Sequence, residues 1–363
     1  MPQPALYVAI TSHGFGHATR TAAVVAEVKR LCPEIFVAIA TTAPRWLLDS
    51  YLRTDFVHRH VVLDVGVVQS DSLGMDQAAT LEKLRRLRDQ QERLVANEAD
   101  FIRQNRIGLV LADMPPLATS IARAVDLPCW ISSNFGWDFI YRPWGGEFVE
   151  MADWIAEQFG HCDRLFRLPF HEPMSAFPAI TDVGLTGGSP HFPLADLRSK
   201  FNLTAPPERT VIMTFGGLGI DQIPYHNLAK FPDWQFITFD RNAPDLPNLC
   251  RVHDHDYRPV DFMPLCSRVL SKPGFSTFAE ACRQDVPIVS VTREGFAEAP
   301  VLLNGVQDLH PHQILSPAEF FQSDWEFLHQ PPNPPRTAGQ LDKDGNQTIA
   351  RAVVEYLYGG NGF

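Results

Sequence analysis

The sequence has no CxxC pair and no long hydrophobic run, and these absences exclude several classes of protein. Its six cysteines lie far apart without metal-ligand spacing, which argues against a zinc site or a disulfide framework and favours a reducing cytoplasm. No apolar stretch approaches about 20 residues, so no spanning helix is expected, and peripheral membrane contact stays open. The N-terminus lacks the charged region of a signal peptide.

Strong basic runs are also missing. The chain of 363 residues has 31 Lys and Arg against 42 Asp and Glu, a formal net charge of −11, so nucleic acid is not an expected partner. Apolar residues make up 45% and charged residues 20%, which is normal for a soluble globular protein. The length suits two domains of ordinary size.

Strand-like apolar runs alternate with helical segments along the first half. The expected strands are 6–11, 35–41, 56–63, 107–112, 128–132 and 163–168, and the expected helices include 18–31 and 76–104. A segment rich in proline and glycine, 169–193, is interpreted as an interdomain linker. Such alternation predicts a doubly wound, mostly parallel sheet.

A second alternating set begins near residue 210. The expected strands are 211–215, 235–239, 269–271 and 288–291, with helices starting near 275, 297 and 317 and a final helix at 346–358. We therefore predict an α/β protein of two Rossmann-like domains. The first is 1–188, completed by the C-terminal helix 346–363, and the second is 189–345.

The strongest local signal is the run T-S-H-G-F-G-H-A-T-R between the first expected strand and helix. Gly14 and Gly16 permit a tight turn and close backbone approach, and the helix N-terminus offers N–H groups to an anion. On a purely structural interpretation the glycines only tighten the turn and His17 caps the helix. His13, His17 and Arg20 within ten residues favour a functional loop.

The second signal is the run S-K-P-G-F-S-T-F-A-E. Gly274 opens a helix, and Ser276 and Thr277 line its first turn. Amides and the helix dipole stabilise phosphate there, with Lys272 nearby, and Glu280 can accept hydrogen bonds from a vicinal diol. The structural alternative is an ordinary capped helix with a glutamate on its solvent face.

Both runs resemble known families. The first is similar to the GGHxxP loop of MurG-like transferases, to the GxGHxxR loop of the UDP-sugar hydrolase of pseudaminic acid synthesis, and to the N-terminal region of plant arabinokinases. The second resembles the donor-binding region of MurG-like and UDP-glycosyltransferase enzymes. The resemblance implies the GT-B fold, with two facing domains and a nucleotide-sugar in the interdomain cleft.

The resemblance also implies roles for single residues in the second half. Gly274, Ser276 and Thr277 would contact the diphosphate and Glu280 the ribose. Glu298 matches the position of a sugar-hydroxyl contact, although the family's usual glutamine is absent. The remaining donor-site candidates are the glycine turn Gly216 and Gly217 and the nucleobase zone at Phe262 and Met263.

In the first half, the loop histidine of these families is a base or a substrate contact, which is His17 here. Arg20 matches the hydrolase pattern and departs from the transferase's proline. Asp113, at the end of a buried strand, is the candidate partner that orients His17, and His13 is the rival base. Capping of the next helix is an equal alternative for Asp113.

The aromatic segment 135–154 has two interpretations. It forms either an acceptor wall, since rings stack on sugars or hold an apolar aglycone, or core packing, which is the default for most of its rings. Asn134 and Asp138 at its start are the better ligand candidates.

The sequence thus predicts an inverting, metal-independent glycosyltransferase that moves a sugar from a nucleotide diphosphate sugar, with a UDP-sugar as the expected donor, to an acceptor hydroxyl. The expected partners are this donor and an acceptor that is apolar or membrane-associated, with no further cofactor. Two alternatives stay open: a nucleotide-sugar hydrolase that uses water, and a non-catalytic nucleotide-sugar-binding protein.

Overall fold

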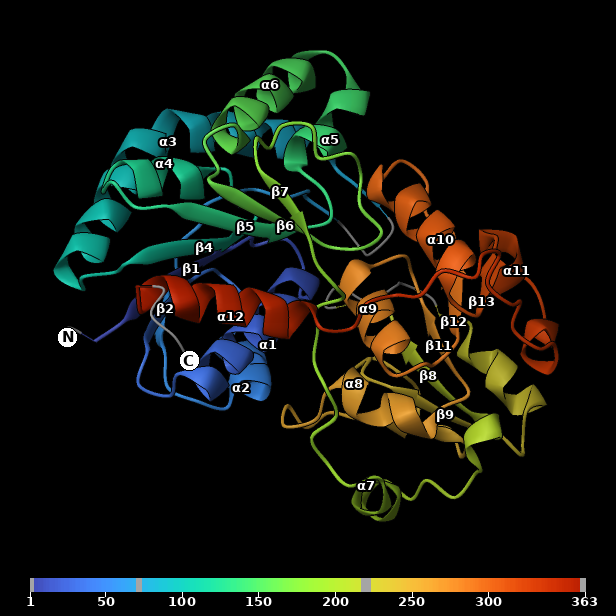
Figure 1. Cartoon of the computed structure of the whole chain (residues 1–363). Helices are drawn as coiled ribbons and strands as arrows, with labels where there is room; N and C mark the ends of the chain where they lie inside the picture. Colours follow the sequence, from blue (N-terminus) through green and yellow to red (C-terminus); the bar gives the residue numbers. More distant parts are fainter. Residues whose placement is uncertain (1–2, 70–73, 217–222, 360–363) are drawn as a thin grey trace. The chain divides into compact units, whose positions relative to one another are not determined.

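The computed structural model describes residues 3–69, 74–216 and 223–359 (Figure 1). They divide into two compact units. The chain leaves the first unit between Gly187 and Gly188 and returns to it between Leu341 and Asp342. Each unit is an α/β body with its own parallel sheet, as the alternation predicts.

In the described part of the first unit, seven parallel strands follow the order β3-β2-β1-β4-β5-β6-β7. The strands are β1 Ala5–Ile10, β2 Phe36–Ala40, β3 Val57–Arg59, β4 Leu109–Asp113, β5 Cys129–Ser133, β6 Arg164–Arg167 and β7 Ile180–Asp182. The helices are α1 Gly16–Leu31, α2 Arg45–Leu52, α3 Gln77–Gln104, α4 Leu117–Arg123, α5 Trp137–Tyr141, α6 Glu147–Phe159 and α12 Gly345–Leu357, with the 3₁₀ turn η1 Arg142–Trp144. Figure 1 shows α1, α2 and α12 on one face of this sheet and α3, α4 and α6 on the other. Every residue of β1 and β4 is buried, which is why these strands read as continuous apolar runs.

In the described part of the second unit, six parallel strands follow the order β10-β9-β8-β11-β12-β13. The strands are β8 Thr210–Thr214, β9 Gln235–Thr238, β10 Leu249–Arg251, β11 Arg268–Ser271, β12 Ile288–Val291 and β13 His312–Leu315. The helices are α7 Leu194–Lys200, α8 Pro259–Phe262, α9 Phe275–Arg283, α10 Glu298–Leu309 and α11 Pro317–Phe321, with the 3₁₀ turns η2 Pro207–Arg209, η3 Tyr225–Lys230, η4 Met263–Leu265 and η5 Glu326–His329. This order matches the first unit strand for strand up to its sixth strand.

The C-terminal helix belongs to the first unit. Figure 1 shows α12 beside α1, and the two helices pack together. Asn346 fastens the returning chain, because its side-chain amide exchanges two hydrogen bonds with Gly187, at 3.2 and 2.8 Å. A side chain at Gly345 would lie 2.1 Å from the Gly184 carbonyl oxygen, so this close approach requires glycine.

The structure corrects several expectations from the sequence. The segment interpreted as a linker contains β7, which pairs with β6 and extends the first sheet. Strands β10 and β13 were not predicted, because they are short and lack an apolar run. The aromatic segment is largely helical, since α5 and α6 span most of it. No described helix is long and apolar enough to cross a bilayer.

Candidate functional site

The predicted loops follow the central strands of each sheet. Strand order reverses between β1 and β4 in the first unit and between β8 and β11 in the second. In an open parallel sheet, loops at the carboxyl ends of the strands on either side of this reversal diverge and leave room for a ligand. The loop beginning at Thr11 and the residue Asp113 lie at the first reversal, and Gly216 and Lys272 lie at the second.

His17 and Asp113 meet at the first reversal. The end of β1 is paired with the end of β4, and the Thr11 amide donates to the Asp113 carbonyl at 2.8 Å. His17, in the first turn of α1, places its Nδ1 2.8 Å from Asp113 Oδ1. Both side chains are buried. Two groups approach Nδ1: Asp113 Oδ1, which can only accept, and Arg20 Nη2, a donor at 3.0 Å. Because Asp113 Oδ1 is the nearer of the two, we assign the hydrogen of the neutral ring to Nδ1, which leaves Nε2 able to accept a proton.

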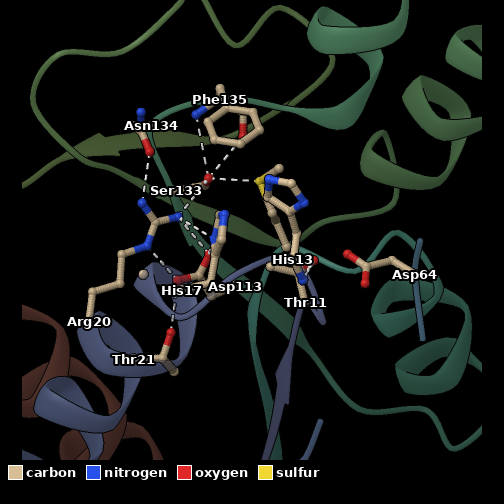
Figure 2. Close-up of polar contacts among 12 residues, drawn as sticks. Thr11, His13, His17, Arg20, Thr21, Asp64, Asp113, Ser133, Asn134 and Phe135 are labelled. Atoms are coloured by element: carbon tan, nitrogen blue, oxygen red, sulfur yellow. Dashed lines mark hydrogen bonds and ion pairs between the residues drawn. The ribbon is translucent and has the colours of Figure 1, made fainter. Parts of the chain in front are cut away.

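Arg20 is held inside the same network (Figure 2). Arg20 is only 2% exposed to solvent, and its side chain forms a two-point ion pair with Asp113. Nε donates to Asp113 Oδ2 at 2.5 Å and Nη2 to Oδ1 at 2.6 Å, while Nη1 donates to Asn134 Oδ1 at 2.8 Å. Arg20 therefore faces Asp113 and Asn134, and this geometry favours a structural contact over a ligand contact.

The Asp113 carboxylate accepts four hydrogen bonds from three residues. Besides His17 and Arg20, the Thr21 hydroxyl donates to Oδ2 at 2.8 Å. Burial alone would raise the pKa of Asp113, but the charges and hydrogen bonds of Arg20 and His17 outweigh it and hold the pKa below its usual value. Asp113 is therefore ionised at neutral pH, as an orienting partner for His17 must be.

His13 has a different environment. Its Nδ1 lies 3.2 Å from the amide of Val67, which donates to it, so the hydrogen of the neutral ring is on Nε2. The turn that supplies this amide needs glycine at Gly66, which has a φ of +60° and would place a Cβ 2.4 Å from His13 Cβ. The two histidines thus carry their ring hydrogens on different nitrogens.

The aromatic segment contributes buried rings to this site. Trp137 lies edge-on to His13, with ring centroids 5.2 Å apart, and to Phe135 at 5.3 Å. Phe135 in turn lies edge-on to His17 at 5.8 Å. Phe135 and Trp137 are buried, so these two rings are core packing that shapes the histidine site. Asn134 is a ligand candidate from the sequence, and its side-chain oxygen accepts a hydrogen bond from Arg20.

Asp64 was not predicted from the sequence, yet it joins this site. It is buried, and its Oδ1 accepts from the Ser12 amide at 3.1 Å. Its Oδ2 accepts from Trp137 Nε1 at 3.0 Å. Figure 2 shows the carboxyl group directed toward Thr11 and His13. No sequence motif surrounds this residue, which follows β3 in a stretch without regular structure.

The second reversal has a different chemistry. Gly216 follows β8 with a φ of +79°, and a Cβ built there would lie 3.6 Å from Lys272 Cε. Two of the predicted phosphate contacts, one from each loop, are therefore neighbours. Gly274 is the N-cap residue of α9 and provides no side-chain cap, and Ser276 and Thr277 lie in the first turn. Gly217 lies outside the described residues.

The other predicted donor contacts are mostly buried. Glu280 accepts from the Gly188 amide at 2.9 Å through Oε1. Glu298 is the buried first residue of α10. Phe262 and Met263 are fully buried, and Phe262 packs edge-on against Phe201 with centroids 5.1 Å apart. A nucleobase could be contacted from this position only through the main chain.

Two D-x-D triplets occur in the second half of the sequence, Asp254-His255-Asp256 and Asp342-Lys343-Asp344. In each triplet the first carboxylate accepts from the amide two residues on, at 3.0 Å and 3.3 Å. Within the residues that the structure describes, no group of three or more His, Cys, Asp or Glu side chains is arranged to hold a metal ion.

Solved structures with the same architecture include several glycosyltransferases. A UDP-glucosyltransferase from Polygonum tinctorium aligns over 99% of this chain and 94% of its own, with a TM-score of 0.62 and 13% identity. The calicheamicin glycosyltransferase CalG4 aligns over 99% and 96%, with a TM-score of 0.59 and 15% identity. SnogD from Streptomyces nogalater aligns over 98% and 95%, with a TM-score of 0.55 and 17% identity. The chain has the GT-B fold of these enzymes.

A curated relative is similar in sequence as well. L-arabinokinase from Arabidopsis thaliana is 31% identical over 306 residues, which cover 81% of this chain and 29% of the relative. The chain thus spans less than a third of that protein's length. No protein-family model matches the sequence.

Proposed function

We propose that this chain is an inverting, metal-independent glycosyltransferase that transfers a sugar from a nucleotide diphosphate sugar, with a UDP-sugar as the expected donor. The observation that carries the proposal is the buried His17–Asp113 pair, with Nδ1 2.8 Å from Oδ1, at the strand reversal of the first sheet. A histidine held in this way is an oriented general base. The GT-B fold shared with glycosyltransferases supports the same class of reaction.

The proposed base is His17 and not His13. His17 keeps the lone pair of Nε2 for a proton because Nδ1–H donates to Asp113. The neutral His13 ring has its hydrogen on Nε2, because Nδ1 accepts from Val67. In their neutral forms, only His17 has an unprotonated Nε2 that can accept a proton.

The proposed reaction is a single displacement. His17 Nε2 takes the proton of the acceptor hydroxyl, whose oxygen forms the new bond to the anomeric carbon. The bond between that carbon and the diphosphate oxygen breaks, and its electron pair leaves with the nucleotide diphosphate. Attack from the face opposite the leaving group inverts the anomeric centre. Amides at Gly216 and Gly274, with Lys272 and the hydroxyls of Ser276 and Thr277, would stabilise the departing charge.

Glu280 is the proposed ribose contact, and Glu298 the proposed contact to a sugar hydroxyl. Arg20 is proposed as a positioning residue, since its ion pair with Asp113 fixes the carboxylate that orients His17. The first unit would then receive the acceptor and the second the donor.

An apolar acceptor is supported by two rings near the histidine loop. Phe15, the N-cap residue of α1, lies edge-on to Trp46 with centroids 5.6 Å apart. Trp46 is 38% exposed, which is unusual for so large an apolar ring. Its exposed face suits an apolar aglycone or a lipid-linked acceptor at a membrane surface. The six cysteines are free thiols, which supports a cytoplasmic location.

Hydrolysis is the second candidate. It is favoured by Arg20, which stands where MurG-like transferases have proline and where the UDP-sugar hydrolase pattern has arginine. In that reaction His17 would take its proton from water. Release of free sugar from the donor at the same rate with and without acceptor would distinguish hydrolysis from transfer.

The first experiment is calorimetry of the purified protein with UDP, GDP, TDP and their sugars. We expect selective binding of UDP and UDP-sugars. Binding should be followed by a turnover assay with the sugar that binds, with and without candidate acceptors. Failure to bind any of these nucleotides would contradict the proposed donor site, and binding without turnover of any kind would favour a non-catalytic binding protein.

A further inference from the structure

Asp64 connects the histidine loop to the aromatic segment. Its Oδ1 accepts from the Ser12 amide at 3.1 Å, and its Oδ2 accepts from Trp137 Nε1 at 3.0 Å. The Thr11 hydroxyl is also hydrogen-bonded to it, and the Thr11 oxygen accepts from the His13 amide at 3.3 Å. The carboxyl group of Asp64 therefore binds the loop backbone directly at Ser12 and also binds the ring that packs on His13.

The charges around His17 suggest a second role for Asp64, which is to stabilise a positive charge on the imidazole. Asp113 is balanced by Arg20, with which it forms a buried two-point ion pair, so this pair contributes little net charge near the imidazole. In the described part of the chain Asp64 forms no ion pair. Trp137, which donates to Asp64, has its ring centroid 6.2 Å from that of His17, and a positive charge on His17 lowers the pKa of Asp64. The ionisable groups facing His17 are thus Asp113, Arg20, His13 and Asp64.

The donors around Asp64 stabilise its ionised form. Each of the three hydrogen-bonding groups points a hydrogen at a carboxyl oxygen, and a neutral carboxylic acid would have to place its own proton among them. Burial acts in the opposite direction and raises the pKa of Asp64, while the hydrogen bonds from Thr11, Ser12 and Trp137 lower it. Burial is the larger effect, so the pKa of Asp64 lies above its usual value, and the hydrogen bonds limit the rise.

We propose that Asp64 is a positioning residue for His17, which holds the histidine loop against Trp137 and supplies the negative charge that stabilises the His17 imidazolium. This proposal rests on the proposed role of His17 as the base. When His17 takes the proton of the acceptor hydroxyl, its ring becomes positive in a buried site. The Arg20–Asp113 pair, which is neutral as a whole, does little to stabilise this positive charge. The carboxylate of Asp64 stabilises it instead.

The test is an NMR titration of histidine-labelled protein, in which the His17 signal is assigned by its loss in His17→Gln. Asp64→Asn keeps the size of the side chain and its acceptor for Ser12, but it removes the charge. We expect the titration midpoint of the His17 signal to move to lower pH by about 0.5–1 unit in this variant. The acid limb of the pH profile of kcat/KM should move in the same direction, with a fall in kcat and little change in KM for the donor.

Trp137→Phe is the matched control, because it removes one donor to Asp64 and retains the carboxylate. Its His17 midpoint should stay close to that of the wild type. An equal shift in both variants would show that loop geometry, and not charge, sets the midpoint, and would overturn the proposal. An unchanged midpoint in Asp64→Asn would overturn it as well.

A measurement on the unaltered protein covers the case in which Asp64→Asn does not fold. The ¹³C chemical shift of the Asp64 carboxyl group should report an ionised group throughout the pH range in which His17 titrates. A carboxyl that stays protonated over that range would contradict the proposal. Turnover that survives in His17→Gln would instead refute the proposed base, and the two failures are thereby distinguished.

Discussion

The two strand reversals hold charge in different ways. At the first, between β1 and β4, ionised side chains are buried against one another, and Arg20 and Asp113 are both almost inaccessible to solvent. At the second, between β8 and β11, glycines bring the main chain close to a lysine, and a helix begins without a side-chain cap. The same sheet topology therefore places buried, ion-paired side chains at one reversal and glycine main chain beside a lysine at the other.

This difference has a consequence for how each site tolerates substitution. A buried charge network depends on every member, because removal of one partner leaves another charge buried without compensation. A site of main-chain amides depends on backbone shape, and single side chains add smaller increments. We therefore expect substitutions in the first loop to abolish turnover or stability, and substitutions in the second to weaken nucleotide binding by degrees.

The largest expected effect is that of His17→Ala on turnover. Loss of a general base typically lowers the rate by about 10²- to 10⁴-fold, and we expect kcat to fall within this range. The affinity for the nucleotide diphosphate, measured by calorimetry, should stay within a factor of two or so, since the proposed donor contacts lie in the other unit. His161→Ala, at an exposed position, is the control. Wild-type turnover in His17→Ala would remove the basis of the proposed mechanism.

Next in size is the effect of Arg20→Ala on stability. Breaking a buried ion pair by removing one partner costs about 3–5 kcal/mol of unfolding free energy, because Asp113 is left buried beside fewer donors. Denaturant unfolding should show this loss. Arg86→Ala is the matched control, since Arg86 pairs with Glu82 on the exposed face of α3 at 3.2 Å and should change stability by less than about 1 kcal/mol. Equal losses in the two variants would mean that the buried pair contributes no more than a surface pair.

Local sequence predicted the elements of both reversals well, and the links between them poorly. The strand runs and glycine turns are encoded within ten residues, so β1, β4, β8, β11 and the loops after them were found. The burial of Arg20 depends on Asp113, 93 residues away. Asp64 depends on Trp137, 73 residues away, and sits in a stretch without periodicity that could have marked it. Contacts between residues so far apart in the sequence cannot be predicted from the spacing of residues within a local motif.

The missed strands have a related explanation. Strand β13 begins with His312 and Gln313, both of which are buried although their side chains are polar. Gln313 accepts from the buried Arg268 at 2.9 Å, so a polar pair stands where apolar alternation would have marked a strand. Strand β7 is three residues long and lies among prolines and glycines typical of a linker. Its pairing with β6 is a property of the assembled sheet.

A smaller effect is expected at the second reversal. Glu280→Ala should weaken UDP binding by about 10-fold, the loss expected from hydrogen bonds to a charged group. The turnover number at saturating donor should change much less than in His17→Ala. Calorimetry of Glu280→Ala beside Glu208→Ala, an exposed position of the same unit, gives the comparison. Unchanged UDP affinity in Glu280→Ala would contradict its assignment to the ribose.

The smallest expected effect is on the pH dependence of the unfolding free energy. It distinguishes the two carboxyl groups of the first site, Asp113 and Asp64. The pKa of Asp113 is held below its usual value of 3.8, because the opposing charges of Arg20 and His17 exceed the penalty of burial. Its contribution to stability is therefore complete above pH 3.8 and is lost as the pH falls below that value. The pKa of Asp64 is raised above 3.8 by burial, so its ionisation costs stability as the pH rises above 3.8.

The two carboxyl groups thus act in different pH windows and with opposite signs. Relative to the wild type, Asp113→Asn should flatten the loss of unfolding free energy below pH 3.8, whatever its stability at neutral pH. Asp64→Asn should instead remove a decline in stability above pH 3.8. Urea unfolding of the three proteins across this range measures both slopes. If both variants altered the slope in the same window, the two carboxyls would titrate as one coupled group, and the separate roles proposed for orientation and for charge could not both be correct.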